Sequence, residues 1–292
     1  MTLSAPIYYK NFKCIADKCQ HSCCIGWEID VDEATMKKYA ALSDGYGKEI
    51  IKSIDICDTS HFRPERDERC PHLDEKGLCR IITALGEEYL CDICREHPRF
   101  YHTTLHGREV GLGMACEAAC RLILTTQTVD IIPIGDTEDE ELPIFDTVKE
   151  REGIYAILFD ATLPYSERRA KIAEAYKVSL TAHSDEEWKE LLASLEYLHE
   201  DHKPLFAAYK TEAIANEDIL SRALAYFIFR HASPAEDAEE FRAAVGFSLF
   251  AERLLASMIT AGGDPFESAR ILSEEIEYSE DNTEAIKFEF YL

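Results

Sequence analysis

Apolar positions in the second half of the chain recur every three or four residues, which is the spacing of a helix with one buried face. The clearest case follows Ser184 and Glu187, whose spacing is typical of a capping box at a helix start. The apolar positions behind this pair are Trp188, Leu191, Leu192, Leu195 and Leu198. This segment is therefore predicted to be an amphipathic helix.

Start and stop residues predict four further helices in the same half. Serine, asparagine and aspartate side chains satisfy free backbone N–H groups at a helix start, and proline fits the first turn. The predicted starts are Ser166, Asn216, Ser233–Pro234 with Glu236, and Asp264–Pro265, and a predicted stop is Gly262–Gly263. Residues 144–292 are therefore expected to form an acidic α-helical domain.

Residues 1–125 show weaker periodicity. Ile29–Val31 is compatible with a short strand and Glu33–Leu42 with a short helix. Prolines and a glycine interrupt the stretch between Cys57 and Cys79, so it has little apolar content with which to fold by itself. A bound metal would supply the missing cross-links, because metal-binding free energy is also folding free energy.

The two halves meet at residues 126–143. A β-like run from Val129 to Ile134 is followed by an acidic, turn-rich stretch from Gly135 to Pro143, which is typical of a linker or long surface loop. The expected organisation is a cysteine-rich metal- or iron–sulfur-binding domain at 1–125, a linker at 126–143 and the helical domain at 144–292. The fold class is predicted to be mainly α, with an irregular cysteine-rich N-terminal region packed on a helical bundle.

The charge balance excludes two classes of partner. The 292 residues include 31 Lys and Arg against 56 Asp and Glu, a net charge of −25. Nucleic acids and anionic membrane surfaces both require a basic surface, so neither is an expected partner. No apolar run approaches the roughly 20 residues of a membrane span, and Met1–Lys13 lacks an apolar signal core. The expected compartment is the cytoplasm.

The cysteines depart from an average composition. There are eleven, and all lie between Cys14 and Cys120. An odd number of cysteines in a reducing compartment points to metal or redox chemistry, whereas disulfides would be expected in a secreted chain. Thiolates are ligands of zinc and of iron–sulfur clusters, and both commonly take four. The positions of the cysteines along the chain therefore predict a metal site, but they do not identify the metal.

Several side chains among or near the cysteines are compatible with more than one role. Cys57 and Cys120 are treated as structural, and Cys91 of the Cys91-x2-Cys94 pair is equally compatible with both roles. His21 and His72 are expected to be polar neighbours, because thiols are plentiful. Arg95 and Arg99 could stabilise the negative charge of a cluster, bind an anionic group of a co-substrate, or form surface ion pairs.

Four ordered motifs within about Ile7 to Leu124 resemble the flagellin lysine-N-methylase family. This family is part of the wider class of C-x-x-C-x-x-C-C zinc- or iron-chelating proteins. The matching words are Cys14-x4-Cys19-x3-Cys23-Cys24-Ile25-Gly26-Trp27, Cys70-Pro71-His72-Leu73 to Leu78-Cys79-Arg80, Leu85-Gly86 with Cys94 to Pro98-Arg99, and Cys116-Glu117-Ala118.

The resemblance implies N-methylation of lysine side chains, with S-adenosylmethionine as the methyl donor. The implied substrate is a protein with exposed lysines, such as flagellin. It also implies an oxygen-sensitive iron–sulfur cluster of the 4Fe-4S type, with zinc as the other metal considered. The motif cysteines that it assigns to metal are Cys14, Cys19, Cys23, Cys24, Cys70, Cys79, Cys94 and Cys116. It identifies no catalytic base.

Eight positions exceed the four ligands of one cluster, so the pattern implies either two metal centres or some structural cysteines. The alternative function is a zinc- or iron–sulfur-binding module without methylase activity. Such a module would serve a structural, redox-sensing or metal-handling role.

Overall fold

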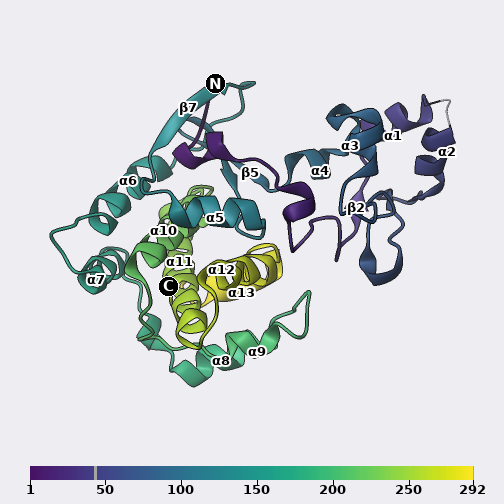
Figure 1. Ribbon diagram of the computed structural model, residues 1–292. Helices are drawn as coiled ribbons and strands as arrows, with labels where there is room; N and C mark the ends of the chain where they lie inside the picture. The colour runs from purple at the N-terminus through teal and green to yellow at the C-terminus, as the bar shows by residue number, and fades with distance from the viewer. Residues whose placement is uncertain (43–44, 292) are drawn as a thin grey trace. The chain divides into compact units, whose positions relative to one another are not determined.

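The computed structural model describes residues 1–42 and 45–291, and these form two compact units. Unit 1 comprises Met1–Phe12 and Phe100–Leu292, and unit 2 comprises Lys13–Arg99. The expected mainly α class is confirmed, with two small sheets in addition to the helices (Figure 1).

Helices account for most of the regular structure. Unit 2 contains α1 (Glu33–Ala40), α2 (Gly45–Lys52), α3 (Arg80–Leu85) and α4 (Asp92–Glu96). Unit 1 contains α5 (Glu117–Thr125), α6 (Thr147–Leu158), α7 (Tyr165–Ala175), α8 (Asp185–Ser194), α9 (Lys203–Phe206), α10 (Glu217–Phe227), α11 (Ala238–Thr260), α12 (Pro265–Leu272) and α13 (Glu280–Phe288).

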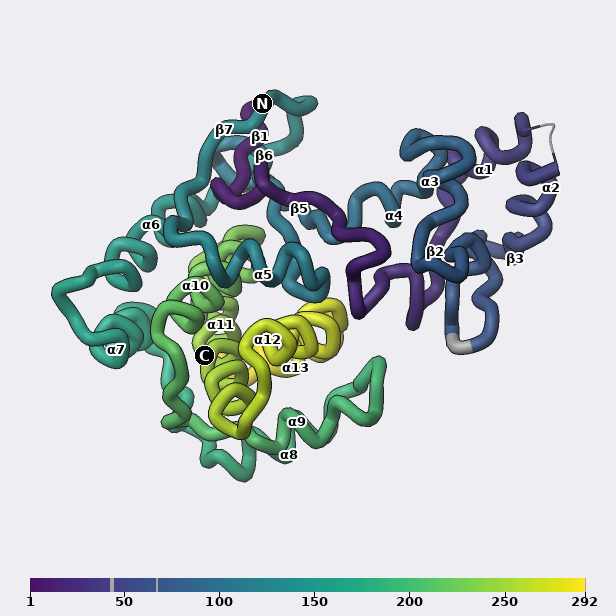
Figure 2. The backbone as a smooth tube through the Cα atoms, viewed as in Figure 1, coloured from purple at the N-terminus to yellow at the C-terminus, as the bar shows by residue number. Residues whose placement is uncertain are grey.

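The sheet of unit 1 has the strand order β5-β6-β1-β7. Its strands are β1 (Thr2–Pro6), β5 (Arg99–Thr104), β6 (Gly107–Leu112) and β7 (Ile131–Asp136). Figure 2 shows β1 between its two partners, parallel to β6 and antiparallel to β7. Gly107 follows the tight turn between β5 and β6 with φ +132°, and a Cβ there would lie 2.5 Å from the Thr2 carbonyl oxygen. Only glycine fits this position without strain.

The division into units differs from the one expected from the cysteine distribution. Residues 100–125 belong with the helices of unit 1, because β6 pairs with β1 and α5 packs against α10 and α12. The β-like run in the expected linker forms β7, which pairs with β1 along its whole length. Strand pairing between distant segments thus decided the boundary, and the local composition did not reveal it.

The helix predictions are confirmed at three starts. Ser184 and Glu187 form the expected capping box of α8, while Asn216 caps α10 and Asp264 caps α12. The start predicted at Ser233–Pro234 is wrong. A π-helical segment, Ile228–Ala232, prolongs α10 up to that point, and the backbone N–H groups of α11 are capped by Asp237 instead.

One further helix start differs from the prediction. α7 begins at Tyr165 after Pro164, so Ser166 lies inside the helix, and it ends at Ala175 before the 3-10 turn at Leu180. In the second half of the chain, the helices α6, α9 and α13 were not predicted. The predicted strand at Ile29–Val31 and helix at Glu33–Leu42 are confirmed within a residue or two, as β2 (Ile29–Asp30) and α1.

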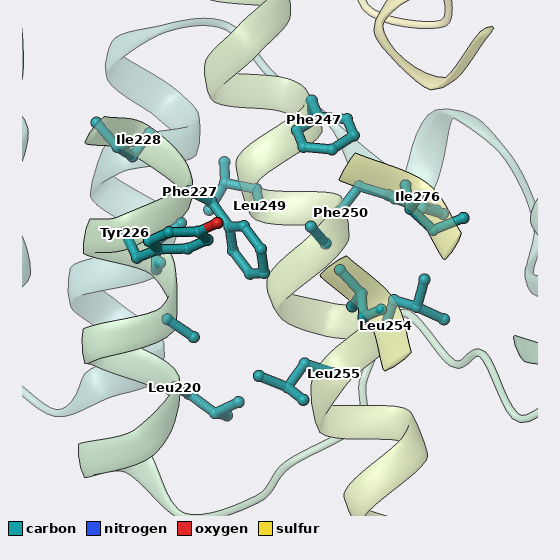
Figure 3. Packing of buried hydrophobic residues seen from close by; sticks show 14 of the residues in the cluster. Leu220, Tyr226, Phe227, Ile228, Phe247, Leu249, Phe250, Leu254, Leu255 and Ile276 are labelled. Atoms are coloured by element: carbon teal, nitrogen blue, oxygen red, sulfur yellow. The ribbon is translucent and has the colours of Figure 1, made fainter. Parts of the chain in front are cut away.

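The core of unit 1 is built around α11. Nearly every side chain from Phe241 to Met258 is buried, and Figure 3 shows Phe247, Phe250 and Leu254 of this helix among apolar side chains of neighbouring segments. α11 is long and apolar enough to cross a membrane, but 89% of its apolar window is buried inside the protein. A helix that is apolar on all sides is expected at the centre of a large core.

Buried ion pairs join the elements of unit 1. Glu109 of β6 accepts hydrogen bonds from Arg151 of α6 at 2.7 Å and lies 2.8 Å from His102 Nε2. Glu277 lies 3.5 Å from Arg230 Nε, and its carboxylate also accepts a hydrogen bond from His231 Nε2 at 2.7 Å, where burial lowers the histidine pKa to about 4 and keeps the ring neutral. Burying a charge is costly unless it is paired and hydrogen-bonded, and these carboxylates have such partners.

Unit 2 has a small core. A three-stranded sheet pairs β2 and β3 (Ile54–Asp55) with β4 (His61–Phe62) between them, so that Ile29 and Ile54 both oppose Phe62. The buried side chains of its core are Ile29, Val31, Tyr39, Ile50, Ile54, Phe62, Ile81 and Cys91. Cys70, Cys79 and Cys94 pack against this core from positions that are partly buried.

Candidate functional site

Short backbone contacts bring cysteines from separate blocks together in unit 2. The N–H of Cys70 donates to the carbonyl of Cys24 at 2.8 Å, next to a β-bridge between Ile25 and Arg69. Gly26 adopts φ +95° at this point, and its N–H donates to the carbonyl of Glu68. A residue with a side chain would be strained there, which explains the glycine after the cysteine pair.

Two other cysteines stand at the starts of helices. Cys79 precedes α3 and Cys91 precedes α4, while Cys94 lies inside α4. A β-bridge pairs Leu73 with Cys79 and folds the segment after Cys70 back on itself. Segments that are far apart in the sequence thereby place their thiols around one small core.

Five thiols lie within electrostatic reach of one another. The charges of Cys24, Cys79 and Cys91 act on Cys70, and those of Cys24, Cys70 and Cys91 act on Cys94. Among the described residues, no three of these sulfur atoms lie within 4.8 Å of each other. We call Cys24, Cys70, Cys79, Cys91 and Cys94 the cysteine group.

Burial and hydrogen bonding set the pKa values of the cysteine group. Burial raises the pKa of Cys70 to about 12 and also raises that of Cys79. A hydrogen bond from the neighbouring thiol of Cys23 lowers the pKa of Cys24 to about 7. Cys91 and Cys94 share a hydrogen bond that lowers the pKa of Cys91 and raises that of Cys94. A thiol in an apolar surrounding becomes a thiolate readily only when a cation compensates its charge.

Backbone amides are also directed at these sulfur atoms. The N–H of His72 hydrogen-bonds to Cys70, and the N–H groups of Ile81 and Ile82 hydrogen-bond to Cys79. Such bonds stabilise a negatively charged sulfur and orient metal ligands. The donor set thus suits a metal that prefers soft sulfur ligands, such as zinc or iron in an iron–sulfur cluster.

The structure brings together only part of the set assigned to metal by the sequence. Four of the assigned cysteines, Cys24, Cys70, Cys79 and Cys94, belong to the cysteine group. The Cys23 thiol forms a hydrogen bond with that of Cys24. Cys14 and Cys19 precede them in a segment of tight turns, where Cys14 is exposed and the Cys19 thiol donates to the His21 carbonyl.

The remaining cysteines are distributed between the two units. Cys116 belongs to unit 1, where it precedes α5. Cys120 is buried in the core of that unit, and its thiol donates to the Phe266 carbonyl. Cys57 is exposed, and its thiol donates to the Thr59 carbonyl at 3.0 Å.

Cys91 is the member of the cysteine group whose role the sequence alone leaves open. Only 1% of its surface is exposed, and its sulfur lies 3.7 Å from the hydroxyl of Tyr39. The signal that identifies it is the Cys91-x2-Cys94 spacing, which allows both thiols to reach one centre. The Cys91 thiol also shares a hydrogen bond with that of Cys94.

His72 is a buried structural neighbour of the cysteine group. Its Nε2 lies 2.9 Å from the Ser53 hydroxyl and its Nδ1 lies 3.3 Å from the Tyr46 hydroxyl. Burial lowers the pKa of His72 to about 4, so the ring is neutral at pH 7. Both ring nitrogens already have protein partners, which leaves the thiols as the donor atoms.

An acidic groove lies on α4 beside the cysteine group. Its volume is about 530 Å³. It is lined by Asp30, Val31, Asp32, Glu33, Met36, Asp58, Thr59, Ser60, Asp92 and Ile93. Asp92 and Ile93 stand between Cys91 and Cys94 in the sequence, so the groove and the cysteine group share one short helix. Glu33 and Asp92 pair with Lys37 and Arg95, and the carboxylates of Asp30, Asp32 and Asp58 keep the lining acidic, which favours a cationic occupant.

Asp32 fixes the shape of this groove. Its carboxylate accepts hydrogen bonds from the N–H groups of Thr35 at 2.8 Å and Asp92 at 3.0 Å. Burial opposes ionisation of Asp32, but these bonds outweigh it and lower the pKa of the carboxyl. One ionised side chain therefore joins the starts of α1 and α4. Arg95 forms ion pairs with Asp92 and Glu96, which is one of the three roles compatible with its sequence position.

Comparison with known proteins identifies relatives of this chain. It is 32% identical over 143 residues to the flagellar biosynthetic protein FliU of Salmonella muenchen, which corresponds to 47% of this chain and 83% of the relative. It is 33% identical over 131 residues to lysine-N-methylases of Salmonella choleraesuis and Salmonella typhimurium, covering 42% of this chain. The match spans about a third of the length of these two methylases. No family model and no solved structure matches.

Proposed function

Because this chain belongs to the family of the flagellar biosynthetic protein FliU, we propose that it is a protein-lysine N-methyltransferase. The substrate in this proposal is a protein with exposed lysines, such as flagellin, and the methyl donor is S-adenosylmethionine. The names of the two related lysine-N-methylases support the reaction class. The observation that carries the proposal is the acidic groove beside the cysteine group.

The reaction requires an unprotonated lysine amine. The Nζ lone pair attacks the methyl carbon, the bond from that carbon to the donor sulfur breaks, and the sulfonium becomes a neutral thioether. The amine then loses a proton to a base or to water. An isolated lysine has a pKa of about 10.4, so the proton must be removed or its pKa lowered by burial.

The acidic groove suits capture of the lysine rather than its activation. Asp30 and Asp58 are exposed carboxylates at its rim, where they attract the ammonium of an approaching lysine. A carboxylate in contact with the amine stabilises the protonated form, which opposes reaction. Met36 and Ile93 line the same groove and offer apolar contact to the four methylene groups of the lysine stem.

The cysteine group is the proposed holder of an iron–sulfur cluster of the 4Fe-4S type. The buried thiols and the amide hydrogen bonds to Cys70 and Cys79 support a metal ligated by thiolates. When bound, such a cluster supplies an iron that can hold the amino and carboxylate groups of the methyl donor, provided that one iron is free of cysteine. Five thiols also allow four ligands with one neighbour that hydrogen-bonds to them.

The spacing of the sulfur atoms is compatible with a centre larger than one ion. Four thiolates at about 2.3 Å from a single zinc ion stand within about 4 Å of each other. No three sulfur atoms of the cysteine group are that close among the described residues. Ligands of a cluster are attached to different irons and stand farther apart, so the sulfur positions are compatible with a cluster.

A second candidate function is a metal-binding module without methylase activity. The small core of unit 2 favours it, because a unit with few buried apolar side chains gains stability from a bound metal. In that case the cysteine group serves structure, redox sensing or metal handling. The two candidates make different predictions about methyl transfer.

Anaerobic purification followed by analysis of iron, sulfide and zinc tests the metal. Brown protein with iron and labile sulfide supports the cluster, and one or two equivalents of zinc without sulfide favour the structural module. Transfer of label from S-adenosylmethionine to flagellin lysines then tests the activity. Failure to transfer label with the metal centre intact would favour the second candidate.

The groove is tested by matched variants. Asp58→Asn removes a rim carboxylate and is expected to lower kcat/KM for a flagellin substrate about fivefold, because an exposed ion pair contributes about 1 kcal/mol. Glu87→Gln removes an exposed carboxylate of unit 2 outside the groove and is the control. Equal loss in both variants would assign the effect to net charge and not to the groove.

A further inference from the structure

A second cluster of metal-ligating side chains lies in unit 1 and contains no cysteine. The loop between α8 and α9 approaches the π-helical segment Ser273–Glu277. Ligand atoms of His199, Glu274 and Glu275 all lie within 4.8 Å of one another. π-Helical turns are rare and often mark functional sites.

Glu275 is held rigidly in this cluster. Its side chain is fully buried, and its carboxylate accepts the N–H of Leu198 at 2.7 Å and the N–H of His199 at 3.2 Å. His202 Nδ1 lies 2.7 Å from the same carboxylate. Asn282 of α13 donates to the backbone carbonyl of Glu275 at 2.8 Å. The position of this potential ligand is thus fixed before any ion binds.

Glu274 has one carboxylate oxygen without a partner. Its Oε1 lies 2.9 Å from Arg270 Nη1. Its Oε2 is shielded from solvent and has no hydrogen-bond partner, and the nearest cationic candidate, His202 Nδ1, is 3.8 Å away. A buried carboxylate oxygen without a partner is costly and calls for an explanation. A cation bound at Oε2 would supply the missing interaction.

The surrounding charges leave room for a divalent ion. Glu267, Glu274 and Glu275 carry three negative charges, and Arg270, which pairs with Glu267 at 2.8 Å, compensates one. The net charge with neutral histidines is therefore −2. Imidazole together with carboxylate is the donor set of first-row divalent metals such as zinc, whereas calcium and magnesium favour oxygen alone.

We propose that His199, Glu274 and Glu275 form a binding site for a divalent transition-metal ion. In this arrangement His202 orients Glu275 from outside the ligand set, as partners of metal ligands commonly do. The ion cross-links the loop between α8 and α9 to the π-helical segment. The site is independent of the cysteine group and of the proposed methyltransferase activity.

Cobalt distinguishes this site from the cysteines. The full chain, purified without oxygen, is titrated with Co²⁺, which gives intense near-ultraviolet charge-transfer bands when bound by thiolates and only visible d–d bands when bound by nitrogen and oxygen. In protein whose cysteine group already holds its metal, we expect one further Co²⁺ per chain that adds d–d bands without thiolate bands and is displaced by Zn²⁺. Co²⁺ that binds exclusively with thiolate bands would overturn the proposal.

Two variants assign the site. Glu274→Gln keeps the shape of the side chain, and His199→Gln changes a residue in a loop between two helices. Both variants are expected to weaken Co²⁺ binding at least about tenfold. Glu280→Gln, an exposed carboxylate at the start of α13, is the control and should bind as the parent does. Circular dichroism verifies that each variant is folded. Unchanged affinity in a folded Glu274→Gln or His199→Gln protein would remove that residue from the site and refute the proposal.

Discussion

The carboxylate of Asp32 accepts a hydrogen bond from the backbone N–H of Asp92, at 3.0 Å, across 60 residues of sequence. Both residues line the acidic groove, and Asp92 follows Cys91 at the start of α4. One hydrogen bond thus connects Asp32 in the groove to the start of the helix that carries Cys94. A change that releases α4 from Asp32 should disturb both the groove and this helix.

The first prediction concerns this bond. Asp32→Ala removes the cap of α1 and the acceptor for Asp92, so it should destabilise unit 2 by about 1–2 kcal/mol. Hydrogen exchange of the amides in α1 and α4 should quicken in this variant. Asp30→Ala, which removes an exposed carboxylate of the same groove, is the control. Equal exchange in the two variants would show that Asp32 does not fasten α4.

The second prediction concerns the membership of the cysteine group. Cys91→Ser and Cys79→Ser should lose most of the bound metal and destabilise unit 2, because both thiols face the small core. Cys57→Ser should change little, since this thiol is exposed and bonded locally. Iron, sulfide and zinc contents measured after anaerobic purification test the assignment. Full metal content in the Cys91→Ser variant would show that Cys91 is a structural residue and not a metal ligand.

The third prediction concerns Glu109. Burial opposes its ionisation, but hydrogen bonds from Arg151 and His102 lower the pKa of Glu109 to about 2. The ordinary value is 4.5, so the folded state binds fewer protons than the unfolded state between these values. The stabilisation is present above about pH 4.5 and is lost as the pH falls toward 2.

Glu109→Gln should therefore lower stability at pH 7 by about 3–5 kcal/mol, since it leaves the buried charge of Arg151 without its partner. The variant should also lose part of the decline in Tm between pH 5 and pH 3. Glu138→Gln, at an exposed position in the same unit, should keep the parent profile. Identical pH profiles for the parent and Glu109→Gln would contradict the linkage.

The fourth prediction concerns the core around α11. Phe250 is fully buried, with its ring 4.6 Å from that of Trp188 and 4.9 Å from that of Tyr209. Phe250→Ala should destabilise unit 1 by about 3–5 kcal/mol, which denaturant unfolding would measure. Phe288→Ala removes a ring that is 72% exposed and should cost much less. Similar losses in the two variants would place Phe250 outside the core.

Features that depend on neighbouring residues could be predicted from the sequence. The capping box at Ser184 and the caps at Asn216 and Asp264 are confirmed, because a side chain and the N–H groups that it satisfies are three residues apart or less. The helix start predicted at Pro234 is wrong, and the reason is also physical. The preceding helix continued as a π-helical segment, and Asp237 was the better-placed cap.

The cysteine motifs could likewise be recognised from the sequence, and the comparison finds relatives named flagellar biosynthetic protein FliU and lysine-N-methylase. The spacing of the cysteines in the sequence did not show which thiols lie close together in the structure. Cys24 and Cys70 meet through a backbone hydrogen bond between distant loops, and Cys91 is placed by a short helix anchored on Asp32.

The amino-acid sequence by itself determined the helical character of the second half, the concentration of thiols in the first and the strong negative charge, because each follows from residue type and local spacing. The tertiary structure decided the membership of the cysteine group, the acidic groove, and the assignment of residues 100–125 to unit 1. These depend on strand pairing and on contacts between residues far apart in the chain, whose free energy is gained only when the whole unit folds.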